Sequence, residues 1–282
     1  FCISDGVQAR FRLALERGGD AEAAWQGLMD AYRSRHPDLA ETLQRALDGR
    51  LAEDWDANVP AFKPSDGPVA TRAASGTVLN ALAAKIDTLV GGSADLAPSN
   101  KTYLNEAAEC QKNSYEGRNI RFGVREHAMA AIMSGMALHG GVKPYGGTFL
   151  VFADYMRPAI RLAALMGLHV IYVFTHDSIG VGEDGPTHQP VETVASLRIL
   201  PGLRVFRPAD ANETALMWKY IFEHNDAPAV TALTRQNLPV MDPAKHPGMK
   251  NFDKGAYVLI EESNPDVLLL ATGSEVQLAV EA

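Results

Sequence analysis

Apolar residues along the chain fall into two kinds of segment, some repeating every three to four positions and others forming short continuous runs. The first pattern predicts helices with one buried face, and the second predicts strands that are buried on both faces of a sheet. Between residues 71 and 234 the two kinds alternate, which indicates an α/β fold with a doubly wound, mostly parallel sheet and helices on both faces. The predicted helices are 72–86, 126–138, 152–166, 192–200 and 210–224, and the predicted strands are 89–92, 120–124, 169–174, 203–207 and 229–234.

The segments on either side of this region have patterns of their own. Residues 21–48 show helical apolar spacing that Pro37 interrupts, so two helices are expected there. After the region, the runs 256–260 and 267–271 resemble strands, and a helix is expected to begin near Ser274. This second alternation indicates the beginning of another α/β unit.

Two linkers divide the chain into three expected parts. The first linker is the proline-containing stretch 58–68, and the second is 241–254. We therefore expect a helical segment with its linker at 1–58, a central domain at 59–246 and an incomplete further domain at 247–282.

The predicted helix at 126–138 is apolar on nearly every side, so it must be buried in a core or in a subunit interface.

Composition limits the possible functions. The 282 residues are 46% hydrophobic, with a formal net charge of -8 and a pI near 5.5. This acidic balance argues against general nucleic-acid binding, and no apolar run is long enough to span a membrane. Cys2 and Cys110 are too few for a disulfide framework, so we expect a soluble protein of the reducing cytoplasm. Because the chain begins at Phe1 rather than at Met, we expect it to be part of a longer polypeptide.

The segment 175–190 has the composition of an active-site loop. It contains two histidines, three acidic residues, three glycines and two prolines, and it directly follows the apolar run 169–174. Loops at the carboxyl ends of strands in open α/β sheets are where ligands usually bind, and a simple surface connection needs neither histidines nor acids. No Gly-x-Ser-x-Gly motif supports a serine hydrolase, and the spacing of His176 and His188 supports no metal site.

Four further motifs lie where strands end or helices begin. They are Gly91–Asn100, Phe122–Met129, Pro144–Phe152 and Leu233–Asn237. Together with the loop, and in this order, they resemble the transketolase family from about Ala21 onward. The resemblance implies the thiamine diphosphate-binding fold: the tail of the diphosphate-binding domain, the pyrimidine-binding domain and the start of the carboxyl-terminal domain.

The resemblance assigns cofactor contacts to several residues. Glu126 matches the carboxylate that hydrogen-bonds the aminopyrimidine ring, a role that an apolar setting supports by raising the pKa of the carboxyl. Phe149, Phe152 and Tyr155 match the aromatic pocket around the ring, although Phe152 and Tyr155 could equally form a core stripe on one helical face. Asp95, followed by Leu96, matches an acid near the cofactor, and a turn-forming aspartate is an equal alternative.

The substrate contacts that the resemblance implies come from the loop and from separate motifs. His176 and His188 match histidines that bind sugar hydroxyls and move protons, for which a near-neutral pKa is suitable. Asp184 matches the acid that hydrogen-bonds the donor sugar. The sugar phosphate is matched by Arg72, Ser99 and Arg235, since two guanidinium groups and a hydroxyl suit a phosphate dianion.

The implied reaction is the transfer of a two-carbon ketol unit from a ketose phosphate to an aldose phosphate in the pentose phosphate pathway. Thiamine diphosphate supplies the carbanion chemistry, and Mg²⁺ or Ca²⁺ with its ligands is expected outside this chain, because the Gly-Asp-Gly motif of the family is missing. A homodimer with sites at the interface is the expected assembly, and sugar phosphates rather than nucleic acid or membrane are the expected partners. Dihydroxyacetone synthase and a non-catalytic fragment remain as alternatives.

Overall fold

The computed structural model describes residues 2–282, and Phe1 lies outside the described residues. The chain forms two compact units, Phe1–Arg50 and Leu51–Ala282. The first unit consists of α1 (Asp5–Arg35) and α2 (Pro37–Leu47), which pack on one another. Pro37 opens the second helix, where a missing backbone N–H costs nothing. Both expected helices are present, but α1 begins at Asp5, well before the predicted start at residue 21.

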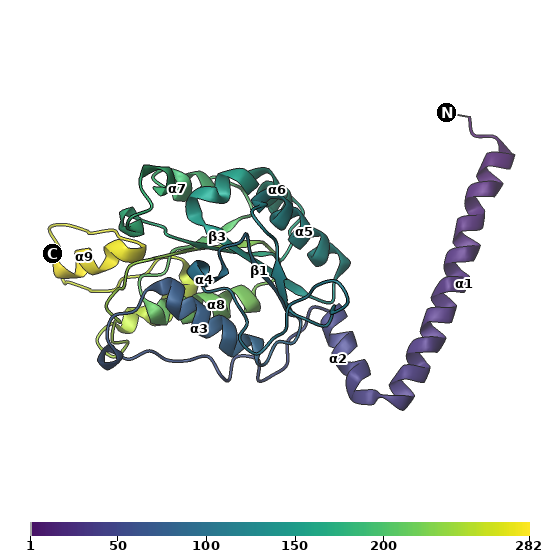
Figure 1. Ribbon diagram of the computed structural model, residues 1–282, viewed down its shortest axis with the longest axis horizontal. Coiled ribbons are helices and arrows are strands. Elements are labelled where there is room, and N and C mark those ends of the chain that lie inside the picture. The colour runs from purple at the N-terminus through teal and green to yellow at the C-terminus, as the bar shows by residue number, and fades with distance from the viewer. Residues whose placement is uncertain (1) are drawn as a thin grey trace. The chain divides into compact units, whose positions relative to one another are not determined.

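The second unit is built on one parallel sheet of six strands in the order β2-β1-β3-β4-β6-β5, which confirms the predicted α/β class (Figure 1). The strands are β1 (Leu89–Ser93), β2 (Asn119–Arg121), β3 (Lys143–Phe149), β4 (Ile171–Thr175), β5 (Arg204–Phe206) and β6 (Ala229–Leu233). The helices are α3 (Thr71–Ala83), α4 (Ala97–Asn100), α5 (Glu126–His139), α6 (Ala153–Leu165), α7 (Thr193–Arg198), α8 (Ala211–Glu223) and α9 (Val276–Glu281). Short 3-10 turns lie at Pro64–Asp66, Leu150–Phe152, Ile179–Val181, Pro186–His188, Pro247–Lys254 and Gly273–Glu275.

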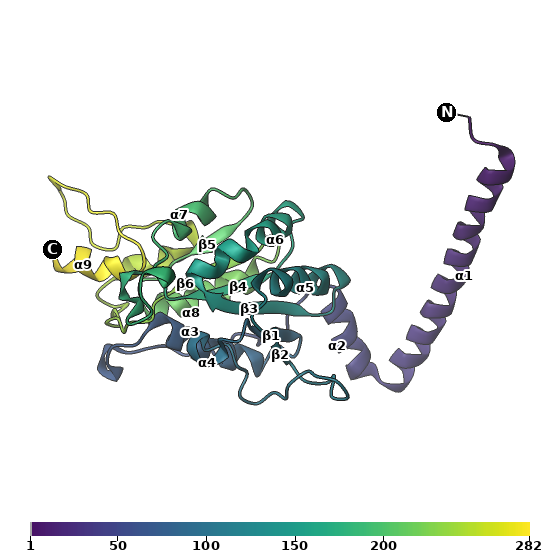
Figure 2. The ribbon, with the colours of Figure 1, turned by 45° about the horizontal axis from the view of Figure 1, so that its top comes forward.

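Helices cover both faces of the sheet, with α3 and α8 on one face and α5, α6 and α7 on the other (Figure 2). A separate hydrophobic core lies on each face because successive residues of a strand point in opposite directions. In β4, Ile171 and Val173 belong to the core under α3 and α8, whereas Tyr172 and Phe174 belong to the other core. The continuous apolar run of this strand is therefore explained by burial on both sides.

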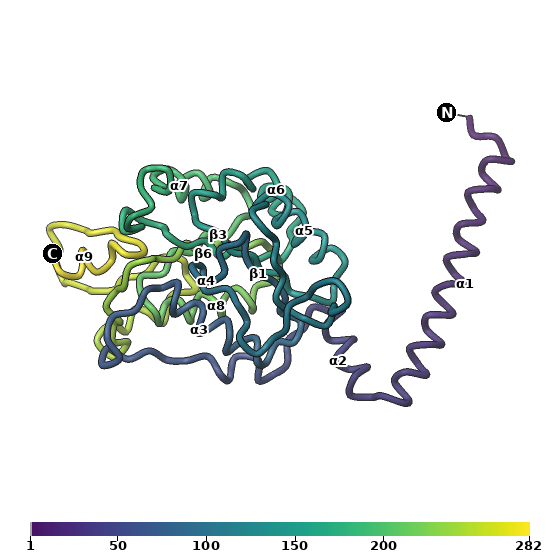
Figure 3. Tube along the Cα trace, in the orientation of Figure 1, coloured from purple at the N-terminus to yellow at the C-terminus, as the bar shows by residue number. Residues whose placement is uncertain are grey.

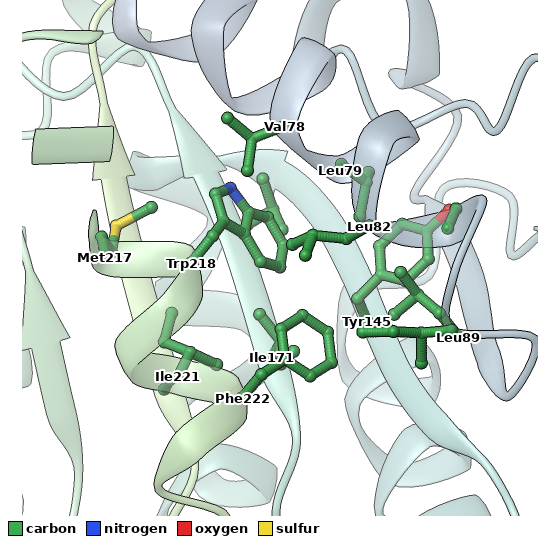
Figure 4. Packing of buried hydrophobic residues seen from close by; sticks show 14 of the residues in the cluster. Val78, Leu79, Leu82, Leu89, Tyr145, Ile171, Met217, Trp218, Ile221 and Phe222 are labelled. Carbon is green, nitrogen blue, oxygen red and sulfur yellow. The ribbon is translucent and has the colours of Figure 1, made fainter. Parts of the chain in front are cut away.

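The core under α3 and α8 is centred on Trp218, which is fully buried. Figure 4 shows Trp218 and Phe222 of α8 beside Val78 and Leu82 of α3, next to Ile171 of the sheet. The indole Nε1–H donates to the Ser75 hydroxyl at 2.9 Å, so burial leaves no polar group of the ring unpaired. This packing holds the central strands in place beneath the loops that follow them.

Two segments differ from the sequence-based expectations. Residues 143–149, which no apolar run marks, form the fully buried strand β3. The strands predicted at 256–260 and 267–271 are wrong, because this part of the described chain is irregular up to the 3-10 turn at Gly273–Glu275 (Figure 3). Apolar side chains there, such as Leu268 and Leu270, remain mostly exposed. An apolar run forms a strand only where a neighbouring strand accepts its backbone hydrogen bonds, and no strand of the described chain lies beside these two runs.

Candidate active site

Several of the predicted site residues lie where the strand order of the sheet reverses its direction. The strand order runs outward from β1 to β2 on one side and from β3 to β4 on the other, so a topological switch point lies between β1 and β3. Ligands of open α/β sheets bind at such a point, beyond the carboxyl ends of the strands. Asp95 and Leu96 follow β1, Phe149 ends β3, His176 follows β4, and Arg235 follows β6.

Aromatic and imidazole rings form the centre of the site. The Phe149 ring centroid lies 3.8 Å from that of His176 and 6.0 Å from that of Phe152, on which it is stacked. The His188 ring lies edge-on at 5.9 Å from Phe149 and 5.3 Å from Phe152. Tyr155 stacks on Phe152 at 5.9 Å, but 66% of the tyrosine is exposed. The structure thus brings four predicted residues into one cluster and leaves Tyr155 at its outer edge.

His176 is buried in an unusual backbone conformation. Its φ of 62° is left-handed, which non-glycine residues rarely adopt, and such strain is often found at functional sites. Its Nε2 lies 4.0 Å from a carboxylate oxygen of Asp184. Burial, reinforced by the positive charge of Arg72, lowers the pKa of His176 from 6.5 to about 4. This lowered pKa differs from the near-neutral value that a proton-moving role would need, and it favours the neutral imidazole.

The residue after His176 is fixed by a buried ion pair. The Asp177 side chain is completely buried, and the Arg207 Nε–H donates to its Oδ2 at 2.8 Å. Arg207 also donates to the Thr272 carbonyl at 2.9 Å and forms an ion pair with Glu275. Burial raises the pKa of the Asp177 carboxyl, while Arg207 opposes that change. Arg207 thereby joins the loop after β4 to the turn that precedes α9.

The three residues predicted to bind phosphate come from separate elements and are partly brought together. Arg72 donates from Nη1 to the backbone carbonyl of Ser99 at 2.9 Å, so the predicted arginine and serine lie side by side. Burial, and then the charge of Arg235, lower the pKa of Arg72. Two guanidinium groups that repel one another form a site to which a bound dianion would be attracted. Gly182 packs against the Arg235 guanidinium, where a Cβ would lie 2.8 Å away, and its positive φ of 86° favours glycine at this position.

Glu126 and Asp95 stand apart from this cluster. Glu126 begins α5 and is 9% exposed, and none of the hydrogen bonds of the described chain links its carboxyl to another predicted residue. Asp95 has a left-handed φ of 63° and is exposed, as a turn residue would be. Neighbouring Leu96 is half-buried, and its N–H donates to the Ser93 hydroxyl at 3.1 Å.

Sequence reasoning missed the residues that support His176 from behind. Asn100 and Thr175 are fully buried and hydrogen-bonded to one another, and Arg207 holds Asp177 from 30 positions further along the chain. A polar residue in an otherwise apolar strand, such as Thr175, was the available signal. Within residues 2–282, no group of three or more potential ligands could hold a metal ion, and no helix is long and apolar enough to cross a membrane.

Comparison with known proteins places these features in a family context. Residues 67–241 match the family described as transketolase, pyrimidine binding domain. The transketolase of Geobacillus stearothermophilus is 53% identical over 285 residues, covering 100% of this chain and 42% of that protein. A Pichia stipitis transketolase complex with sedoheptulose-7-phosphate is 44% identical with a TM-score of 0.94, covering 99% of this chain and 42% of the other. A mutant from the same organism in complex with xylulose-5-phosphate gives the same identity, TM-score and coverage. The chain therefore spans less than half the length of these relatives.

Proposed function

Because this chain belongs to the transketolase family, we propose that it supplies the pyrimidine-binding half of a thiamine diphosphate site in an enzyme that transfers two-carbon ketol units. The observation that carries this proposal is the cluster of Phe149, Phe152, His176 and His188 at the switch point of the sheet. A stacked pair of phenylalanines next to two imidazoles offers an aromatic surface on one side and polar nitrogens on the other.

The residues at this edge suit the aminopyrimidine ring of the cofactor. Thiamine diphosphate, when bound, supplies a stabilised carbanion for making and breaking carbon–carbon bonds. In our proposal Phe149 and Phe152 pack on the ring, the nearly buried Glu126 carboxyl hydrogen-bonds it, and Tyr155, Asp95 and Leu96 lie along its border. Residues that hold the diphosphate and its Mg²⁺ or Ca²⁺ are expected in another part of the protein.

The substrate side of the proposal rests on charge. Related structures contain sedoheptulose-7-phosphate and xylulose-5-phosphate, and the Arg72–Arg235 pair with Ser99 beside it suits a sugar phosphate of this kind. We place His176, Asp184 and His188 at the hydroxyl groups of the sugar. Xylulose 5-phosphate as donor and ribose 5-phosphate or erythrose 4-phosphate as acceptor are the proposed substrates.

The expected domain limits stay a proposal: a helical tail at 1–58, the pyrimidine-binding domain at 59–246 and part of the carboxyl-terminal domain at 247–282. The compact units divide between Arg50 and Leu51, and the family match covers 67–241.

The free cysteines Cys2 and Cys110 fit the reducing cytoplasm, which is where we expect the protein to act.

A second copy of the chain is the proposed partner of the outer surface of α5 and α6. These two helices pack together, and each leaves large apolar side chains exposed. They are Ile132 and Leu138 on α5, and Tyr155, Leu162 and Leu165 on α6. Exposed apolar patches mark interfaces, and the all-round apolar sequence of α5 agrees with burial in a homodimer. Sedimentation of Leu165→Asp, expected to be monomeric, against a dimeric parent tests this assembly.

Reconstitution tests the proposed activity. The chain is mixed with a separately produced diphosphate-binding domain of a transketolase, thiamine diphosphate and Mg²⁺, and transfer from xylulose 5-phosphate is measured. Transfer to ribose 5-phosphate supports the proposal. Transfer to formaldehyde alone would instead identify a dihydroxyacetone synthase, and an assembled but inactive complex would identify a non-catalytic fragment. Either of these results contradicts the proposed function.

A further inference from the structure

A continuous chain of hydrogen bonds runs behind the active-site cluster and ends on His176. The Ser93 hydroxyl lies 2.7 Å from the Asn100 Oδ1 and 2.9 Å from the Gly147 carbonyl oxygen. The Asn100 Nδ2 lies 2.7 Å from the Thr175 Oγ1, and this oxygen lies 2.9 Å from the His176 Nδ1. All four residues are buried, and they come from β1, α4 and the end of β4. Water cannot compete for these groups, so each partner determines what the next can donate or accept.

The direction of donation along this chain follows from the amide of Asn100. Its Nδ2 can only donate, so the Thr175 hydroxyl oxygen accepts at that contact. Asn100 and His176 are the only partners of this hydroxyl in the described part of the protein. The hydroxyl hydrogen therefore has one acceptor, the Nδ1 of His176. Were Nδ1 protonated, the hydroxyl hydrogen of Thr175 would be buried without an acceptor, which is costly.

The groups on the other side of the ring favour the same assignment. The Nε2 of His176 lies 4.0 Å from the Asp184 carboxylate, which can only accept when ionised. Arg72, Arg235 and His188 are the other charged or titratable groups that act on the ring, and each disfavours a positive imidazole. The ring is also held in orientation by Phe149, whose centroid is 3.8 Å away. Nδ1 therefore accepts a hydrogen bond from Thr175 in the interior, and Nε2 is left to donate towards the site.

We propose that Asn100 and Thr175 are positioning residues that hold His176 as the neutral tautomer protonated at Nε2. His176 then presents a fixed N–H to the site and acts as a hydrogen-bond donor rather than as a proton carrier. Donation to a substrate oxygen at this position rests on the proposed function, whereas the tautomer itself is a property of this chain. A preorganised donor of this kind stabilises negative charge that develops on an oxygen without any rearrangement at the moment of reaction.

The test is a long-range proton–nitrogen NMR spectrum of the ¹⁵N-labelled 282-residue chain at pH 7. The His176 signals are assigned by their loss in His176→Asn, since asparagine tolerates a left-handed φ. We expect the Nδ1 of His176 to resonate as an unprotonated nitrogen and Nε2 as a protonated one. The reverse pattern would overturn the proposal, because it would mean that the Asn100 amide faces the other way.

Variants of this hydrogen-bond chain from Ser93 through Asn100 and Thr175 to His176, here called the relay, supply a second readout. Asn100→Asp, recorded at pH 8 with the new carboxyl ionised, offers Thr175 only an acceptor, so protonation is expected to move to Nδ1. Thr175→Val, which keeps the shape, is expected to populate both tautomers, and it tests the relay if the aspartate variant does not fold. Thr148→Val is the matched control, since Thr148 is buried on the adjacent strand and its hydroxyl has no partner in the described chain.

The outcomes separate this inference from the proposed function. An unchanged His176 spectrum in both Asn100→Asp and Thr175→Val, or an equal change in Thr148→Val, would overturn the relay. The spectra need neither cofactor nor turnover, so an inactive reconstituted enzyme with the expected spectra contradicts the function alone. An active enzyme with the reverse tautomer contradicts the relay alone.

Discussion

The chain contains two threonine–histidine pairs with the same local contact but different surroundings. The Thr175 hydroxyl lies 2.9 Å from the His176 Nδ1, and the Thr187 hydroxyl lies 2.9 Å from the His188 Nδ1. Thr175 is fully buried at the end of β4, whereas Thr187 is exposed within a short 3-10 turn. Asn100 anchors the first hydroxyl, while the second has no further partner within residues 2–282.

The comparison shows that a sequence-local contact fixes the state of a histidine only when the rest of the fold holds its partner. At the sheet edge, Asn100 fixes the direction of the Thr175 hydroxyl, and no water is available as a substitute. In the exposed turn, solvent can replace either partner at little cost. The two histidines therefore suit different tasks: His176 can hold a substrate atom in a fixed position, and His188 can adapt to it.

The largest expected effect comes from the ion pair beneath the anchored histidine. Arg207→Ala leaves the Asp177 carboxylate buried and without a counter-charge, which should lower the free energy of unfolding by about 3–5 kcal/mol. Urea denaturation measures this loss. Arg204→Ala, three residues earlier at the start of β5, removes an ion pair with the exposed Asp226 and should have little effect. Equal losses in both variants would show that Asp177 does not depend on Arg207.

A smaller effect is expected from removing each threonine hydroxyl. Thr175→Val leaves donors of Asn100 and an acceptor of His176 unpaired in the interior, so the free energy of unfolding should fall by about 1–3 kcal/mol. Thr187→Val should change it by less than about 0.5 kcal/mol, as is usual at exposed sites. The same denaturation experiment measures both. Similar values for the two variants would contradict the distinction between an anchored and a solvated pair.

The smallest expected effect is on the pH dependence of stability. The folded pKa of His176, about 4, lies below its ordinary value of 6.5. Between these values the unfolded chain binds a proton that the folded chain does not, so stability contributed by the neutral ring is present above pH 6.5 and is lost towards pH 4. His176→Asn removes this term, so the stability of the parent should fall more steeply across that window, by on the order of 1 kcal/mol. Parallel curves for the parent and His176→Asn would contradict the lowered pKa.

Part of the fold could be predicted because the apolar pattern reflects burial in this chain itself. The run that forms β4 is buried on both faces, so its pattern is unambiguous. β3 was missed because Gly146 and Gly147 interrupt its pattern, although both are needed for close packing. A Cβ at Gly146 would lie 2.6 Å from the Met133 sulfur, and one at Gly147 would lie 2.7 Å from Thr102.

For the candidate site, the sequence pointed to the residues that face the site but not to the buried residues that hold them in position. The two histidines were conspicuous in the glycine-containing loop itself, whereas the arginines and Phe149 were named only through the resemblance to the family. Asn100 and Arg207 were not identified, since their importance depends on a hydrogen-bond direction and on a contact between distant segments. Neither has a local sequence signal. The lowered pKa of His176 likewise arises from burial and from Arg72, which lies far away in the sequence.

The most direct test of the central claim is the reconstituted transfer from xylulose 5-phosphate to ribose 5-phosphate, measured for the parent chain, Glu126→Gln and Glu192→Gln. Glu126 is nearly buried at the start of α5, where we place the aminopyrimidine ring, whereas Glu192 is exposed before α7 and serves as the matched control. We predict that Glu192→Gln retains the parent rate and that Glu126→Gln loses at least about 100-fold, the usual contribution of a positioned acid–base group. A Glu126→Gln chain that assembles and transfers the ketol unit at the parent rate would contradict the claim that this chain supplies the pyrimidine-binding half of the site.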